Sequence, residues 1–357
     1  MESDDDDDNE RQFLSEVHMA SLAEDLGVNR RVSRFFFQIP KALRPNIDCD
    51  GGSVVEDQKR GILQDAVPSK EIQEILQGSS YNGEACKYDD DEDGDPVISR
   101  QSIQQQKRDN SNTYDAVITL EHAMTTPLKD VGHQVWLGAL LLCDFMLYAW
   151  QSFHEAIVLD LGAGVGLTSI VAAYIAQTVF CTDKGDPLLK LAQRNVERNT
   201  DTLPVKGEVR VRELDWNTQA FPSPEYNQRQ TRSEFPFRAQ DLQVLENCSV
   251  ILAAEVVYDV ELTDVFFRFL YSILIRPPAK TAYLTVEKRQ VFSIADLDIV
   301  SPAYEQFREN LADLASVDQG PVRFVCTQVD TNFPQFFQYQ RVKELELWKV
   351  EVAFTNS

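Results

Sequence analysis

The chain has 357 residues, of which 43% are hydrophobic and 25% charged, ordinary values for a globular protein with one large domain or two small ones. Its net charge of -23 is unusual, and residues 1–100 hold 24 of the 57 acidic residues but only 11 of the 34 basic ones. Tight binding to DNA or RNA needs a basic surface, so we expect no direct nucleic-acid contact. The charge is compatible with a basic protein partner.

We expect no membrane-spanning segment, export signal or metal site. The N-terminus is acidic at residues 4–8, where an export signal would carry positive charge. The most apolar run, residues 135–150, contains Asp144 and is shorter than the ~20 residues that a spanning helix needs. The six cysteines and four histidines are scattered, which predicts free thiols in a reducing compartment, the cytoplasm or the nucleus.

Residues 1–113 are expected to be an acidic, partly disordered N-terminal region that turnover does not require. Apolar stretches such as residues 35–37 could form a small accessory element. The acidic run at residues 89–95 resembles a calcium-binding loop but lacks Glu at the twelfth position, which favours a solvated charge run. Together with the polar residues 101–112, this run is predicted to be a linker.

From Tyr114 onward, short apolar strands alternate with helices, which predicts a mostly parallel sheet covered on both faces. The last two strands have no helix between them and therefore predict a C-terminal antiparallel hairpin. Residues 114–357 are thus expected to form one α/β domain. Strands are expected at residues 116–120, 156–161, 179–182, 209–214, 250–254, 281–286, 322–328 and 345–352, and helices at 132–149, 168–177, 186–199, 262–275 and 304–314.

The most specific motif is a glycine-rich loop between a buried strand and a helix, with glycines at positions 162, 164 and 166 and Asp160 two residues before the first. Glycines let the backbone turn tightly and approach a ligand, and the helix N-terminus offers free N–H groups. The oxidoreductase fingerprint G-x-G-x-x-G would need glycine where Leu167 stands. The spacing therefore disfavours a nicotinamide-dependent enzyme.

Two acidic positions follow the next strands. Asp183 lies seventeen residues after Gly166 and can accept both ribose hydroxyls of an adenosine ligand. Asp215 and Trp216 follow the third strand, where an acid can bind the adenine amino group and an indole can cover the ring. In isolation, such an acid is more often a turn residue, and the tryptophan is as often part of the core. The glycine loop before them favours the ligand-binding interpretation.

These motifs resemble the seven-strand methyltransferases that modify protein lysines, known as family 16. The resemblance covers about residues 114–355 and implies a class I (Rossmann-like) methyltransferase fold with S-adenosylmethionine as cofactor. It implies a lysine of a non-histone nuclear protein as substrate, nuclear and cytoplasmic localisation, a basic nucleic-acid-binding partner and chaperone contacts. The motifs are EHAMTTPL at residues 121–128, GHQVW at 132–136, ELDW at 213–216, AEVVY at 254–258 and EKR at 287–289.

The resemblance also assigns roles to residues. Trp136 is expected to contact the cofactor, Asp160 and Gly162 to line its methionine end, and Asp183 to hold the ribose. Trp216 is expected to lie on the adenine, and the backbone at Ala254 to close the site. The predicted cofactor-binding residues are therefore Trp136, Asp160, Gly162, Gly164, Gly166, Asp183, Asp215, Trp216 and Ala254.

The acceptor side is predicted at Glu255 and Tyr258, where the family has an acid-x-x-Tyr motif with Asp in many members. A lysine amine, whose free pKa is about 10.4, must be neutral to attack, and a desolvated channel beside a sulfonium lowers that pKa. Glu255 is expected to capture the ammonium, as a base or only by positioning it, and Tyr258 to form a polar wall. A capping glutamate and a core tyrosine are the structural alternative. Competing functions are a small-molecule or nucleic-acid methyltransferase, or a scaffold without chemistry.

Overall fold

A computed structural model describes residues 12–43, 113–200, 207–218, 221–223, 233–289, 291–293, 298–317 and 322–354, apart from residues 16, 18–20 and 28. The described segments belong to one compact unit, which joins the segment before Pro45 to the chain from Asn112 onward. The predicted linker and the possible calcium-binding run lie outside the described residues.

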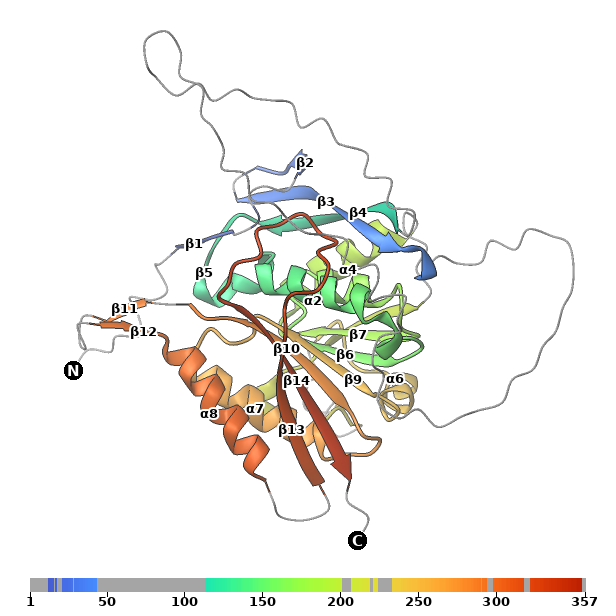
Figure 1. Cartoon of the computed structure of the whole chain (residues 1–357). Helices are drawn as coiled ribbons and strands as arrows, with labels where there is room; N and C mark the ends of the chain where they lie inside the picture. The colour runs from blue at the N-terminus through green and yellow to red at the C-terminus, as the bar shows by residue number, and fades with distance from the viewer. Residues whose placement is uncertain are drawn as a thin grey trace, which may run out of the picture. The chain divides into compact units, whose positions relative to one another are not determined.

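The centre of this unit is a seven-stranded sheet with the strand order β13-β14-β10-β9-β6-β7-β8 (Figure 1). All neighbouring pairs from β8 to β10 are parallel, whereas β14 is antiparallel to both β10 and β13. This confirms the predicted class I, Rossmann-like sheet with its C-terminal antiparallel hairpin. The strands are β6 (Ile157–Leu161), β7 (Thr178–Asp183), β8 (Glu208–Glu213), β9 (Val250–Ala254), β10 (Thr281–Glu287), β13 (Val322–Val329) and β14 (Leu345–Phe354).

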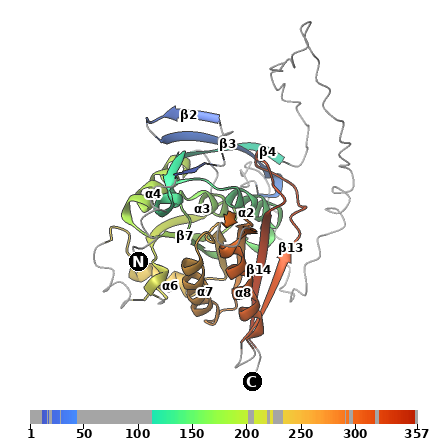
Figure 2. The ribbon, with the colours of Figure 1, turned by 90° about the vertical axis from the view of Figure 1, so that its left-hand side faces the viewer.

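In the described part of the chain, helices cover both faces of the sheet (Figures 1 and 2). Side chains of a strand alternate between its faces, so Val158 of β6 belongs to one hydrophobic cluster, and Leu159 and Leu161 belong to the other. Burial on both faces explains why the strands read as apolar runs. One face carries α2 (Leu137–Tyr148), α3 (Leu167–Ala172) and α4 (Asp186–Thr200), and the other α6 (Ala239–Leu245), α7 (Val260–Leu274) and α8 (Pro302–Ser316).

Short elements complete the described fold. The sequence predicts no helix where α6 lies, between the expected strands at residues 209–214 and 250–254, and the helix expected over residues 132–149 begins only at Leu137. A 3-10 helix, η3 (Leu128–His133), precedes it instead. Other short elements are the 3-10 helices η2 (Lys41–Leu43), η4 (Trp150–Ser152) and η5 (Trp216–Thr218) and the hairpin of β11 (Val291–Ser293) and β12 (Asp298–Val300).

The chain reverses its direction of progress across the sheet at β6. After β6 the chain adds β7 and β8 on one side, and then returns to place β9 on the other side of β6. The loops that follow β6 and β9 therefore leave in opposite directions and open a crevice at the carboxyl ends of these strands. In open α/β sheets, this switch point is where ligands bind.

The N-terminal region differs from the accessory role expected for it. β2 (Ser21–Asp25), β3 (Arg30–Pro40) and β4 (Thr113–Ala123) form an antiparallel three-stranded sheet, so the strand predicted near residue 116 exists but lies outside the main sheet. Ile39 and Ile118 are fully buried in the cluster that contains α2. The boundary expected at residue 113 therefore does not divide the structure, because β3 and β4 share one core-facing apolar surface.

A shorter N-terminal strand, β1 (Gln12–Leu14), pairs antiparallel with β5 (Thr125–Pro127) just before η3. The buried side chain of Gln134 binds both strands of this pair. Its Nε2 donates hydrogen bonds to the carbonyl oxygen of Phe13 at 2.8 Å and to Oγ1 of Thr126 at 2.7 Å. The N-terminal strand thus supports the segment that leads into α2.

The apolar helix α2 lies within the protein core. By length and composition alone, the stretch Leu128–Tyr148 could cross a membrane, but 72% of an apolar run of 18 residues within it is buried in the structure. The one acidic residue of α2 is Asp144. Its carboxylate accepts hydrogen bonds from Arg341 Nη2 at 2.6 Å and from the backbone N–H groups of Phe336 and Phe337 at 2.8 and 2.9 Å. Asp144 therefore ties α2 to the loop between β13 and β14.

Candidate cofactor and acceptor site

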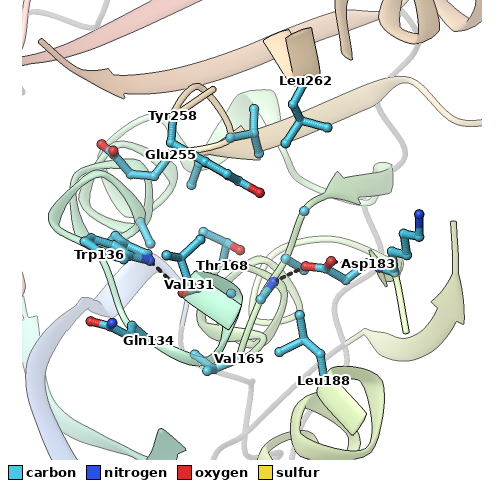
Figure 3. Close-up of a pocket in the computed structure, with 18 of the residues that line it drawn as sticks. Val131, Gln134, Trp136, Val165, Thr168, Asp183, Leu188, Glu255, Tyr258 and Leu262 are labelled. Carbon is cyan, nitrogen blue, oxygen red and sulfur yellow. Dashed lines mark hydrogen bonds between the residues drawn. The ribbon is translucent and has the colours of Figure 1, made fainter. Parts of the chain in front are cut away.

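A cavity lies at the switch point, between the carboxyl ends of β6, β7, β8 and β9 and the segment from η3 to α2 (Figure 3). Asp160 and Gly166 are the predicted site residues that do not line it. The close-up shows Glu255, Tyr258 and Leu262 on one side of the cavity and Gln134, Val165 and Leu188 on the other. The predicted residues that the fold brings together at the cavity are Trp136, Gly162, Gly164, Asp183, Asp215, Trp216, Ala254, Glu255 and Tyr258.

The glycine loop is built from left-handed backbone. Gly162, Gly164 and Gly166 have φ values of 68°, 54° and 90°, which side chains other than glycine rarely adopt. A Cβ at Gly164 would lie 2.8 Å from the carbonyl oxygen of Gly132, and one at Gly162 would lie 2.7 Å from Val256 Cγ1. The loop is therefore packed from both sides. Gly166 differs in role, because it precedes α3 and sits behind the cavity.

Asp160 does not line the cavity, contrary to the expectation that it lines the methionine end of the cofactor. Its buried carboxylate accepts hydrogen bonds of 2.6 Å from the hydroxyls of Thr168 and Ser169, at the start of α3. Burial raises the pKa of Asp160 to about 6, although the two hydroxyls oppose this shift and the charge of Asp183 adds to it. Asp160 thus anchors the helix that follows the glycine loop.

Asp183 ends β7 and faces the cavity. One carboxylate oxygen accepts the backbone N–H of Gly164 at 2.9 Å, and the other accepts that of Lys184 at 2.7 Å. Desolvation raises the pKa of Asp183, while these two hydrogen bonds and the nearby His133 oppose the rise. A carboxylate offers about four lone-pair positions, so acceptor capacity for two further donors remains.

Asp215 lines the cavity, but its oxygens are already engaged. Lys184 Nζ lies 2.9 Å from Oδ2, and Asn217 donates to Oδ1 from its backbone and its side chain at 3.0 and 2.9 Å. Burial raises the pKa of Asp215, but these hydrogen bonds outweigh burial and leave the pKa lowered. The expected contact with an adenine amino group would therefore have to compete with Lys184, a cavity residue that the sequence analysis missed.

Two indole rings form walls of the cavity. Trp216, at the start of η5, packs edge-on against Phe266 with ring centres 5.2 Å apart and lies close to Gly162. Its Nε1 is buried without a hydrogen-bond partner among the described residues. Trp136 precedes α2, and its Nε1 donates to the carbonyl oxygen of Val131 at 3.0 Å. Both rings thus line the cavity, and their contacts with the cofactor stay predictions.

The carboxylate of Glu255 contacts neighbouring residues of the protein. Glu255 lies directly after β9 with φ 56°, and its side chain is 4% exposed. Its carboxylate sits beside the first turn of α2, where a Cβ at Gly138 would be 2.2 Å from Oε1. Oε2 lies 3.3 Å from Nη2 of Arg289. The carboxylate is therefore held by the protein, which favours a positioning role over direct capture of an ammonium.

Tyr258 is the more accessible of the two predicted acceptor residues, with 40% of its surface exposed. Partial desolvation of the hydroxyl and the negative charges of Asp183 and Asp259 raise the pKa of Tyr258 to about 12. The hydroxyl is therefore protonated near neutral pH. It can donate a hydrogen bond at the cavity or accept one.

The structure adds cavity residues that the sequence analysis did not assign. Gln134 and Thr168 line the cavity, and Arg289 lies against Trp136 and Glu255. Arg289 belongs to a motif already quoted, at the carboxyl end of a predicted strand, and that position was the available signal. Gln134 had a similar signal, because it stands two residues before Trp136 in the GHQVW motif.

Comparisons with known proteins agree with this geometry. Residues 115–230 match the family model described as lysine methyltransferase. Methyltransferase-like protein 22 of Mus musculus is 42% identical over 240 residues, which cover 66% of this chain and 60% of that protein. The human protein of the same name is also 42% identical, over 66% of this chain and 57% of its own length. The matched region thus spans about three fifths of the length of these relatives.

Shorter matches point the same way. Protein N-lysine methyltransferase METTL21A of Danio rerio is 35% identical over 99 residues, which cover 27% of this chain and 44% of that protein. The family match includes the glycine loop, Asp183 and Trp216 but ends before Glu255 and Tyr258. The predicted resemblance is therefore confirmed, and residues 115–230 match the family model for lysine methyltransferases.

Proposed function

We propose that this chain transfers the methyl group of S-adenosylmethionine to a lysine side chain of a protein. The observation that carries the proposal is one cavity in which the glycine loop, Asp183 and Trp216 meet Glu255 and Tyr258. Its cofactor side lies in the segment that matches the lysine methyltransferase family.

The residues present fit the adenosine part of this cofactor. Asp183 keeps acceptor capacity for two ribose hydroxyls after binding the N–H groups of Gly164 and Lys184. The left-handed glycines let the backbone approach a ligand closely, and Trp216 offers a ring face or edge for the base. When bound, the cofactor supplies a methyl group on a positively charged sulfur.

The acceptor side can favour a neutral amine. Apolar side chains of Val256 and Leu262 line this part of the cavity and reduce its hydration. Desolvation and a neighbouring positive charge both lower the pKa of a lysine amine, so that it loses its proton before attack. Tyr258 would orient the amine through its hydroxyl. The negative charge of Glu255 by itself favours the ammonium, so its part would be to attract the protonated lysine before the proton is lost. Correct orientation supplies much of the acceleration of such a displacement.

The substrate proposal is a non-histone protein, basic and nucleic-acid-binding, in the nucleus or cytoplasm, with chaperones as further contacts. The family resemblance is its main support. The net charge of -23 adds to it, because an acidic enzyme attracts a basic partner over a distance of about a Debye length.

Labelling in cell extract tests the proposal. Purified protein would be incubated with S-adenosylmethionine carrying a radioactive methyl group, and the product digested with protease or nuclease before its lysines are analysed. We expect protease-sensitive label recovered as methyl-lysine. Gly164→Val is the inactive control, since its Cβ would collide with Gly132. Label in nucleic acid or in a small molecule would refute the lysine assignment, and absence of cofactor binding would favour a scaffold.

A further inference from the structure

Arg289 does not line the cavity itself but contacts two residues that do, Trp136 and Glu255. It follows β10, and its Cζ lies 4.5 Å from the ring centre of Trp136. Its Nη2 lies 3.3 Å from Oε2 of Glu255 and 3.4 Å from Oε2 of Glu287. One guanidinium thus contacts a cofactor-side indole and an acceptor-side carboxylate.

The contact with Trp136 bears on the cofactor side. The indole has its Nε1 fixed by the carbonyl oxygen of Val131, and its ring faces the guanidinium. A guanidinium is planar and weakly hydrated, so it stacks on an indole better than an ammonium does. Arg289 therefore limits the movement of a ring that forms part of the cavity wall.

The contact with Glu255 bears on the acceptor side. The left-handed backbone at Glu255 is costly for a residue other than glycine, and the backbone N–H of Glu255 donates to the carbonyl oxygen of Thr285 at 3.0 Å. The same Thr285 donates through Oγ1 to the carbonyl oxygen of Gly138 at 3.0 Å. β9, β10 and α2 thus meet around the carboxylate, and Arg289 balances its charge.

We propose that Arg289 is a positioning residue of the transfer site, which sets Trp136 and Glu255 relative to each other. The inference rests on the proposed function. Arg289 holds Glu255 against α2 and Trp136 against the cavity, so cofactor and acceptor are aligned through one side chain. The carboxylates of Glu255 and Glu287 and the one guanidinium of Arg289 leave a net negative charge there. This charge attracts a lysine ammonium, while Glu255 stays bound to Arg289.

The test compares Arg289→Gln and Arg289→Lys with wild-type full-length protein, using calorimetry with S-adenosylhomocysteine. We expect Arg289→Gln to bind about 2- to 30-fold more weakly, the range that a cation–π contact corresponds to. Arg289→Lys keeps the charge but loses the planar stack, so its affinity should be intermediate. Arg308→Gln is the matched control, because Arg308 lies 4.4 Å over Trp348, which does not line the cavity.

A double-mutant cycle separates positioning from general stability. If Arg289 acts through the indole, the effects of Arg289→Gln and Trp136→Phe on affinity should be strongly non-additive. Wild-type affinity in Arg289→Gln and Arg289→Lys would overturn the inference, as would additive effects in the cycle. If Arg289→Gln does not fold, Arg289→Lys alone decides. A wild-type protein that does not bind S-adenosylhomocysteine would instead refute the proposed function.

Discussion

Replacing Asp183 by asparagine isolates the carboxylate expected to hold the ribose. The two oxygens of Asp183 already accept the N–H groups of Gly164 and Lys184, at 2.9 and 2.7 Å. Asparagine keeps one acceptor oxygen and turns the other into a donor. One loop N–H and one ribose hydroxyl then lose their acceptor, and the remaining hydrogen bonds lose their charge.

Hydrogen bonds to charged groups contribute about 1.5–3 kcal/mol, so the affinity for S-adenosylhomocysteine should fall about 10- to 160-fold. Titration calorimetry near neutral pH measures this directly. Asp215→Asn is the matched control, because Lys184 and Asn217 already engage the oxygens of Asp215. We expect Asp215→Asn to lower the affinity by less than about 5-fold, because Lys184 competes with an adenine amino group for the carboxylate of Asp215.

The pH dependence of binding adds a second readout. Desolvation raises the pKa of Asp183, so the carboxyl of the free protein takes up a proton at a higher pH than an exposed aspartate does. Cofactor affinity of the wild type should therefore weaken as pH falls through that raised pKa, whereas Asp183→Asn should lack this component. An Asp183→Asn protein that folds and binds within about threefold of wild type would refute the ribose assignment.

Three further predictions concern the support of the site. Burial raises the pKa of Asp160 to about 6, so the folded state binds the proton of Asp160 more tightly than the unfolded chain does, and this contribution to stability falls as pH rises from about 4 to 6. In urea unfolding, Asp160→Asn should therefore gain stability relative to wild type as pH rises over that range. The absence of such a gain would contradict the raised pKa. Asp144→Ala leaves Arg341 without its buried counter-charge and should lower the free energy of unfolding by about 3–5 kcal/mol. A loss below about 1 kcal/mol in urea unfolding would show that the contact is weak. Removing residues 1–15 deletes the carbonyl that Gln134 binds and should weaken cofactor binding more than removing residues 1–11; equal affinities by calorimetry would exclude β1 as a support.

The sequence alone predicted the features that depend on neighbouring residues. Short apolar runs that alternate with helical segments located most strands of the main sheet and most helices that cover it, and the absence of a helix between β13 and β14 predicted their hairpin. The glycine loop was found from spacing, because its three left-handed positions exclude most side chains. Asp183 was found because strand ends of a parallel sheet share one edge.

The tertiary structure decided which distant segments meet. β3 pairs with β4 across some seventy residues of intervening chain, so the N-terminal region could not be assigned to the fold from its own short apolar runs. Motifs predicted both Asp160 and Glu255 as site residues. Only the structure shows that Asp160 binds hydroxyls behind the loop, and that Glu255, which does line the cavity, pairs with Arg289, 34 residues away. A carboxylate can accept donors from any direction, so local sequence fixes its position on a strand end but not its partner. That choice follows from which helix and which neighbouring strand pack against it.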